Sequence, residues 1–183
     1  MMKLAKVLKD YSNTNCLNLL LIGSLFTFCQ KKIPAKFEKM NSEFDQMVQD
    51  YLSFDVPTIT IMELRPEVNY LFIDTRNPQE YNTSTIKGAI NIPNQKAIRQ
   101  KLKSIQKDTP IIVFCSIGYR SEKMTQKLLE LGYKNVNNLY GSIFEWANRD
   151  LPLYQNTVKT NTIHTYNRSW SKWINNKKLT KIW

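Results

Sequence analysis

Residues 111–114, Ile-Ile-Val-Phe, form an apolar run that leads directly into Cys115. A short run of this kind, without polar alternation, predicts a strand that is buried on both faces. A helical pattern follows, in which apolar residues recur at helical spacing, namely Met124, Leu128 and Leu131. The stretch therefore predicts an inner strand followed by a helix, which is one unit of an α/β fold.

Cys115 lies between this strand and the N-terminus of the helix. Backbone N–H groups converge at such a position, and the helix dipole favours an anion there. We therefore expect the pKa of the Cys115 thiol to lie below its ordinary value and the thiolate to act as a nucleophile. Gly118 permits a loop that folds around the sulfur, and Arg120 brings a cation to an incoming anion. The alternative is that Cys115 is only a small buried hydrophobic residue.

Four further short segments are expected to form the remaining strands. They cover residues 56–60, 70–73, 89–92 and 136–139, with helical segments between them and a last helix at about 142–148. Strands that alternate with helices predict an α/β fold with a parallel sheet. Sites in such sheets lie beyond the carboxyl ends of the strands, where both Cys115 and Asp74 fall.

Four motifs follow one another along the chain: Leu-Phe-Ile-Asp-Thr-Arg with Glu-Tyr at 71–81, Ile-Lys-Gly-Ala-Ile-Asn-Ile-Pro at 86–93, Cys-Ser-Ile-Gly-Tyr-Arg-Ser at 115–121, and Leu-Gly-Tyr-Lys-Asn-Val, Leu-Tyr-Gly-Ser and a Trp at 131–146. In this order they resemble the rhodanese family, over roughly residues 56–154. The resemblance implies a three-layer rhodanese-like fold, with a mostly parallel central sheet flanked by helices. Many members carry a His where this chain has Thr85.

The resemblance also implies sulfur transfer through a persulfide on Cys115. The substrate would be held in a cradle formed by the loop residues Ser116, Ile117, Gly118, Tyr119, Arg120 and Ser121. A small anionic donor such as thiosulfate would give its outer sulfur to Cys115, and a thiol or cyanide would accept it. Such a reaction needs a low-pKa nucleophile and N–H donors, so we expect neither a cofactor nor a metal ion.

The charged residues after the second strand are expected to be structural. Asp74 and Arg76 lie near the predicted site, and Glu80 is a plausible partner for Arg76, because charged groups at a sheet end usually need partners. His164 is the single histidine and lies beyond the domain, so it is a poor candidate for a general base. We therefore expect chemistry that proceeds without one.

Two other function classes compete with sulfur transfer. Cysteine-dependent phosphatases and arsenate reductases also use a Cys…Arg loop, but with five residues between the two. Here four residues, 116–119, separate Cys115 from Arg120, which predicts a loop too tight for phosphate. A non-catalytic rhodanese-like binding or regulatory module is the other alternative, although such modules often lack the cysteine.

The net charge of +11 lies at the two ends of the chain. Residues 37–153 hold 14 basic and 14 acidic side chains, whereas residues 1–36 and 154–183 are strongly basic. We expect four segments: a leader at 1–30, a helical lead-in at 31–55, the rhodanese-like domain at 56–154 and a basic aromatic extension at 155–183. The lead-in prediction depends on apolar residues at helical spacing between Phe37 and Tyr51.

The leader resembles an export signal. Lys3, Lys6 and Lys9 precede an apolar run at 17–29 that is too short for an ordinary transmembrane helix. Cys29 ends this run, which favours either a cleaved signal peptide or a lipoprotein signal with the lipid on Cys29. We therefore expect a periplasmic or membrane-anchored protein. A buried helix of a cytoplasmic protein is the alternative.

The C-terminal extension combines six basic residues with three tryptophans, Trp170, Trp173 and Trp183. One hypothesis is contact with an anionic membrane surface. The favoured hypothesis is that Trp170 and Trp173 pack onto the domain and leave the lysines outward, because a free tail would expose a large apolar area. No nucleic-acid partner is expected of an exported protein.

Overall fold

The computed structural model describes residues 16–17, 28–29, 33–38 and 42–183. The chain divides into two compact units, residues 1–40 and 41–183. The first contains an antiparallel pair of short strands, β1 (Cys16–Leu17) and β2 (Phe28–Cys29), and helix α2 (Ala35–Glu38). The predicted leader, residues 1–30, lies almost entirely outside the described residues, so export and lipidation of Cys29 stay predictions. Within the described ranges, no helix is long and apolar enough to cross a membrane.

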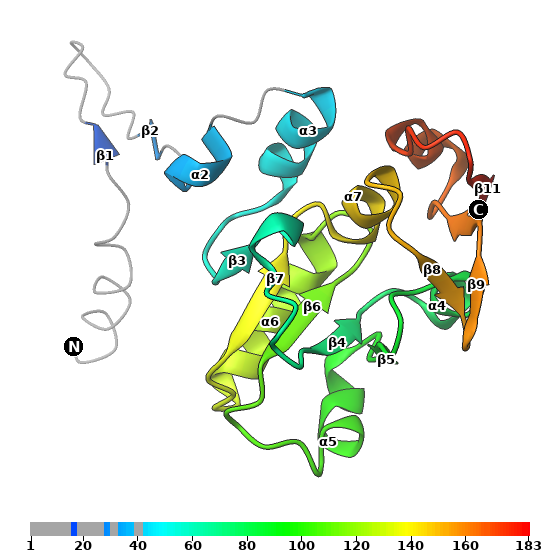
Figure 1. The fold of residues 1–183 in the computed structure, drawn as a ribbon. Coiled ribbons are helices and arrows are strands. Elements are labelled where there is room, and N and C mark those ends of the chain that lie inside the picture. Colours follow the sequence, from blue (N-terminus) through cyan, green and yellow to red (C-terminus); the bar gives the residue numbers. More distant parts are fainter. Residues whose placement is uncertain (1–15, 18–27, 30–32, 39–41) are drawn as a thin grey trace, which may run out of the picture. The chain divides into compact units, whose positions relative to one another are not determined.

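The second unit is built on a five-stranded sheet with the order β3-β7-β6-β4-β5, in which every pair is parallel (Figure 1). Its strands are β3 (Thr58–Ile59), β4 (Leu71–Asp74), β5 (Ile90–Asn91), β6 (Ile111–Phe114) and β7 (Val136–Leu139). β6 lies at the centre, as its uninterrupted apolar run predicts. Asp74 pairs with Phe114 in the register, so Asp74 lies beside the residue that precedes Cys115.

Helices cover both faces of this sheet. Successive side chains of a strand point to opposite faces. Ile73, Ile111 and Val113 therefore share one face, where they form a buried cluster with residues of α5 (Ile98–Lys101) and α6 (Tyr119–Glu130). Phe72 lies on the other face, with ring centroids 6.4 Å from Phe114 and 6.1 Å from Trp146 of α7 (Ser142–Asn148). The predicted α/β fold with a parallel sheet flanked by helices is confirmed.

Short helices connect the strands. Helix α4 (Pro78–Thr83) follows β4, with Pro78 in its first turn and a capping box between Asn77 and Glu80. Single turns of 3₁₀ helix lie at η1 (Ile61–Glu63) and η2 (Gln95–Ala97). α6 begins immediately after Gly118 and α7 immediately after Gly141. These two helix N-termini both lie at the carboxyl end of the sheet, next to Cys115.

The predicted helical lead-in consists of two helices, α2 and α3 (Glu43–Tyr51). Ser42 begins α3, because its hydroxyl oxygen accepts a hydrogen bond from the Asp45 amide at 3.0 Å. After the helix, the buried Glu122 carboxylate of α6 accepts hydrogen bonds from the amides of Ser53 and Phe54 at 2.9 and 2.7 Å. This attachment holds the end of α3, including Tyr51, next to the N-terminal part of α6.

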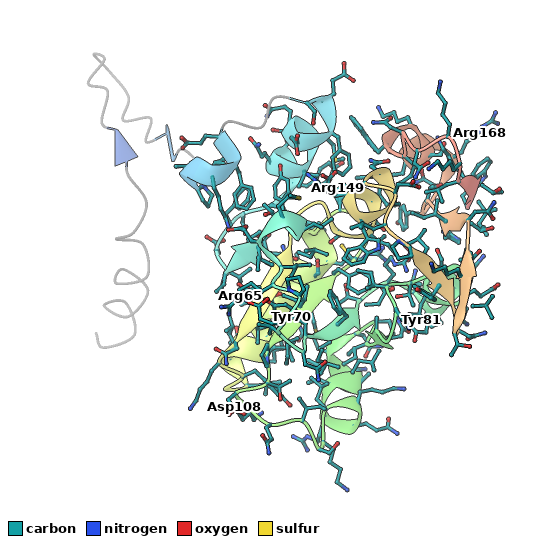
Figure 2. The ribbon with its side chains drawn as sticks, viewed as in Figure 1. Arg65, Tyr70, Tyr81, Asp108, Arg149 and Arg168 are labelled. Atoms are coloured by element: carbon teal, nitrogen blue, oxygen red, sulfur yellow. The ribbon has the colours of Figure 1, made fainter. Side chains whose placement is uncertain are left out.

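The C-terminal segment folds as part of the second unit. It contains an antiparallel hairpin, β8 (Leu153–Gln155) and β9 (Val158–Thr160), a parallel pair, β10 (Thr162–His164) and β11 (Thr180–Ile182), and the 3₁₀ helix η3 (Arg168–Trp173). Trp173 packs edge-on against Phe44 at 6.2 Å between centroids, and Trp170 lies 5.5 Å from the ring of Tyr51. Arg168 lies at the outer edge of this unit (Figure 2). Both tryptophan rings therefore contact α3 of the lead-in, and the Trp173 carbonyl accepts a hydrogen bond from Asn148 Nδ2 of α7 at 2.9 Å.

Candidate active site

The loop from Cys115 to Arg120 lies at the carboxyl end of β6 and is hydrogen-bonded to the N-terminus of α7. The Ile143 and Phe144 amides at the start of α7 donate hydrogen bonds to the carbonyls of Cys115 and Ser116 at 3.2 and 3.1 Å. The Cys115 amide donates in turn to the Ser142 hydroxyl at 3.1 Å. These bonds fix the first two carbonyls of the loop on the side of α7.

Gly118 is required at the turn of this loop. Its φ is +122°, a region that residues with a side chain rarely adopt. A Cβ atom at this position would also lie 3.0 and 3.3 Å from the two methyl carbons of Leu52. The Gly118 amide donates to Cys115 Sγ at 3.2 Å. The prediction that Gly118 lets the loop fold around the sulfur is therefore supported by both its backbone conformation and its contacts.

Ser121 and Asn138 stabilise the other side of the loop. Asn138 Nδ2 donates to the Gly118 carbonyl at 3.1 Å, and Ser121 Oγ lies 2.7 Å from Asn138 Oδ1 and 3.6 Å from Cys115 Sγ. A hydroxyl carries one hydrogen, so the closer amide oxygen is its better acceptor in the resting site. The amides of Gly118 and Ser121 are therefore the principal hydrogen-bond donors to the thiolate.

The Cys115 thiol is 1% exposed, and burial by itself would raise its pKa. The positive charge of Arg120 and the hydrogen bonds from Ser121 and Gly118 act in the opposite direction and prevail, so the pKa lies below its ordinary value. The thiol therefore has the electrostatic surroundings of a nucleophile, as expected from its place between a strand and a helix N-terminus.

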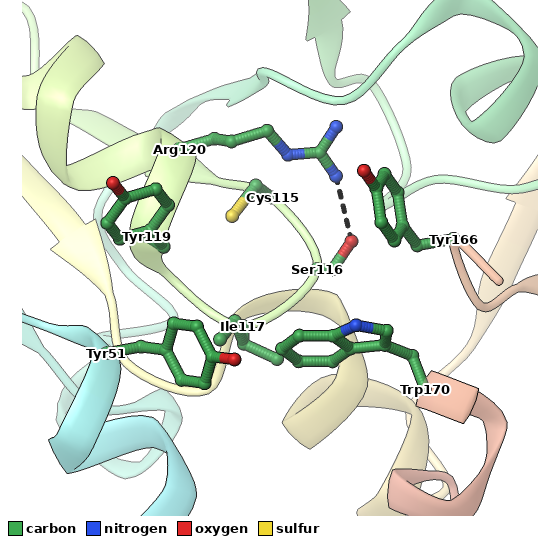
Figure 3. Close-up of a pocket in the computed structure, with 8 residues that line it drawn as sticks. All are labelled: Tyr51, Cys115, Ser116, Ile117, Tyr119, Arg120, Tyr166 and Trp170. Carbon is green, nitrogen blue, oxygen red and sulfur yellow. Dashed lines mark hydrogen bonds between the residues drawn. The ribbon is translucent and has the colours of Figure 1, made fainter.

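Arg120 is bound by Glu80, which differs from the predicted pairing of Glu80 with Arg76. The two terminal nitrogens of Arg120 each donate to one Glu80 oxygen at 2.8 Å. Figure 3 shows the further hydrogen bond that Arg120 Nη2 donates to Ser116 Oγ at 2.9 Å. Burial alone would raise the pKa of Glu80, but its contacts with Arg120 lower it, so the carboxylate stays ionised. Arg120 thus links the loop to α4, and its charge is compensated.

Arg76 pairs with its neighbour Asp74, and both side chains are fully buried. Arg76 donates to both Asp74 oxygens, including 2.7 Å from Nη2 to Oδ2, and to the Ser84 carbonyl at 2.5 Å. Thr85 Oγ1 donates to Asp74 Oδ2 at 2.8 Å, and the backbone of Thr85 bridges to Tyr154. The position where many rhodanese-like domains carry a His therefore helps hold this ion pair.

A pocket of about 250 Å³ opens above Cys115. The loop residues Ser116, Ile117 and Arg120 form its floor and one wall. Around its mouth lie four aromatic rings, which we call the aromatic rim: Tyr51, Tyr119, Tyr166 and Trp170 (Figure 3). They come from α3, from the loop itself and from the C-terminal segment, so three separate parts of the chain complete the site.

Sequence reasoning missed most of the aromatic rim and the position of His164. Tyr166 lies over the guanidinium of Arg120, with the ring centroid 5.6 Å from Cζ. His164 is nearly buried, and it interacts electrostatically with Glu80, Arg76 and Arg120. Burial lowers the pKa of His164, and its Nδ1 accepts a hydrogen bond from the Tyr166 amide at 3.1 Å, so the imidazole is neutral. The density of aromatic residues between 166 and 173 was the sequence feature that could have indicated this part of the site.

The lowered pKa of Cys115 should appear in its alkylation kinetics. In a Cys16→Ser, Cys29→Ser background, the rate with iodoacetamide should reach half of its plateau at a pH below that of an ordinary thiol, because the thiolate is the reactive form. Arg120→Met should move this midpoint to higher pH, since the Arg120 charge is the largest influence that lowers the pKa. A wild-type midpoint at or above the ordinary value would contradict the assigned electrostatics.

Comparison with known proteins agrees with this architecture. A model of the rhodanese-like domain family matches residues 60–149. A sulfurtransferase of Allochromatium vinosum is 34% identical over 83 residues, which cover 45% of this chain and 77% of that protein. A tRNA uridine(34) hydroxylase of Acinetobacter baumannii is 36% identical over 131 residues, which cover 68% of this chain and 41% of that protein.

The chain covers less than half the length of the hydroxylases that it matches. Among solved structures, the BH2092 protein of Bacillus halodurans superposes with a TM-score of 0.51 at 22% identity, over 63% of this chain and 88% of that one, which shows a shared fold. Sequence motifs, fold and relatives agree, and the chain belongs to the rhodanese-like family.

Proposed function

We propose that the chain is a sulfurtransferase that moves sulfane sulfur from a thiosulfate-type donor to a thiol or cyanide through a persulfide on Cys115. The observation that carries the proposal is the surroundings of the Cys115 thiol. The amides of Gly118 and Ser121 donate hydrogen bonds to it, its pKa is lowered, and it lines a pocket. The similarity to the Allochromatium vinosum sulfurtransferase supports the same chemistry.

The reaction has two displacement steps. The Cys115 thiolate attacks the outer sulfur of thiosulfate, a bond forms between this sulfur and Sγ, and the S–S bond of the donor breaks. Sulfite leaves with the electron pair. Cyanide or an acceptor thiolate then attacks the outer sulfur of the persulfide, which yields thiocyanate or a new persulfide and returns the Cys115 thiolate. Neither step requires a side chain to move a proton.

The loop provides what both steps need. The amides of Gly118 and Ser121 stabilise negative charge on Cys115 before the attack and after sulfur release. Arg120 adds positive potential and, through its bonds to Glu80 and Ser116, keeps the loop in one conformation. A phosphatase function is less favoured, because the guanidinium fork that would bind phosphate already binds the Glu80 carboxylate.

The test is a thiosulfate–cyanide assay that compares the wild type with Cys115→Ala. Thiocyanate formation should be lost completely in Cys115→Ala, and incubation with thiosulfate alone should add one sulfur atom to the wild type in intact-mass spectra. If neither thiocyanate nor the added sulfur is found while Cys115 still alkylates readily, thiosulfate is not a donor for this site, and a rhodanese-like binding module becomes the favoured function.

RNA modification is a second candidate function. It is favoured by the Acinetobacter baumannii tRNA uridine(34) hydroxylase, whose similarity reaches well beyond the span of the rhodanese-like match. Such a function would require the nucleic-acid partner that the sequence did not lead us to expect. The test is mass spectrometry of tRNA from cells whose only copy of the chain is either the wild type or Cys115→Ala. If the chain modifies RNA, the two tRNA samples should differ at uridine 34.

A further inference from the structure

The aromatic rim exposes a large ring surface directly around a buried thiol. Tyr51, Tyr119 and Tyr166 are 48, 42 and 53% exposed, whereas Cys115 is 1% exposed. Tyr51 contacts both Trp170 and Tyr119, at 5.5 and 6.3 Å between ring centroids. Contiguous exposed apolar surface of this kind marks a place where a ligand binds. A bare oxyanion, which has no apolar surface, would leave these rings in water.

The charge at the site also favours a ligand that carries apolar surface. Arg120 and Glu80 form a two-point ion pair, so together they carry no net charge. A dianion such as thiosulfate must give up much of its hydration to reach Cys115, and only loop amides and a compensated cation replace it. A monoanion gives up less hydration, and an attached flat group can lie among the rings instead of in solvent.

We propose that the preferred sulfur donor of this site is an organic sulfane compound that carries a flat aromatic group next to its sulfur-bearing anionic head. The aromatic rim binds that group while the outer sulfur reaches Cys115. This inference rests on the proposed sulfur transfer and specifies its substrate class. The pocket volume of about 250 Å³ leaves room for a substituted ring above the loop.

An arenethiosulfonate is the simplest probe of this class. The Cys115 thiolate attacks its outer sulfur, a bond forms between that sulfur and Sγ, and the bond to the sulfonyl sulfur breaks. The arenesulfinate leaves with the electron pair. The products are the same Cys115 persulfide and one monoanion, so cyanide can serve as the acceptor in every assay.

The test compares kcat/KM for benzenethiosulfonate and methanethiosulfonate, two monoanions that differ in the ring, with thiosulfate as the third donor. The two have different intrinsic reactivities, but that difference is the same for every variant of the protein. The ratio of kcat/KM for benzenethiosulfonate to kcat/KM for methanethiosulfonate is therefore compared between variants. A change in this ratio measures the contribution of the aromatic rim. Trp170→Ala and Tyr51→Ala should each lower this ratio about two- to tenfold. Trp170→Phe, which keeps a ring, should restore most of it.

Trp183→Ala is the matched control, because Trp183 is 57% exposed and lies outside the pocket. Its ratio should equal that of the wild type. If all three donors transfer sulfur and the ratio is the same in the rim variants and in the control, the inference about the donor is wrong. The proposed sulfur transfer would then still stand. Absence of transfer from every donor would overturn the proposed function, and this inference with it.

Discussion

Replacing Arg76 with methionine is expected to lower the free energy of unfolding by about 3–5 kcal/mol, the usual effect of removing one partner from a buried ion pair. Asp74 and Arg76 are both fully buried, and the Arg76 guanidinium supplies three of the hydrogen bonds to the Asp74 carboxylate. Without the guanidinium, the Asp74 carboxylate would keep its Thr85 and Arg76-amide contacts but lose its counter-charge. Urea denaturation, followed by circular dichroism, measures the change.

Arg149→Met is the matched control for this experiment. The Arg149–Glu145 pair lies on the surface of α7, so the same substitution there should cost about 1 kcal/mol or less. Adding Asp74→Asn to Arg76→Met should recover part of the loss, because it removes the uncompensated charge. If Arg76→Met and Arg149→Met are equally mild, the buried pair does not hold the end of β4 as the contacts indicate.

Deleting residues 156–183 is expected to lower the melting temperature by about 10 °C or more. The segment buries Ile163 and Ile174 completely, each worth roughly 1.5–3 kcal/mol, and a chain of this size loses about 2–4 °C for each kcal/mol. The deletion also removes the packing of Trp173 on Phe44 and half of the aromatic rim. Sulfur transfer should therefore fall together with stability.

A single substitution keeps this prediction testable if the shortened chain does not fold. Ile174→Ala should destabilise by roughly 2–5 kcal/mol, whereas Lys177→Ala, at an exposed position, should stay within about 0.5 kcal/mol of the wild type. Thermal unfolding of all variants gives the comparison. If the shortened chain melts like the full one but no longer binds anionic vesicles, the segment serves a membrane surface and not the domain.

Local patterns were enough to predict the centre of the fold. The bounds of β6 and β7 agree with the segments predicted for them, and β6 is the inner strand because its four residues are all apolar and buried. The position of Cys115 at a strand end and the turn at Gly118 also follow from neighbours in the sequence. Such features depend on side-chain period, strand burial and the backbone freedom of glycine, which act over a few residues.

The partners in the site were decided by tertiary structure alone. Glu80 and Arg120 lie 40 residues apart and meet only because α4 and the Cys115 loop follow neighbouring strands of the sheet. The aromatic rim gathers Tyr51, Tyr119, Tyr166 and Trp170 from three parts of the chain. Charges and rings have no periodic signature that names a distant partner. Their pairing depends on how the helices and the C-terminal segment pack, so the sequence determined the position of Cys115 between a strand and a helix, and the three-dimensional fold determined what surrounds it.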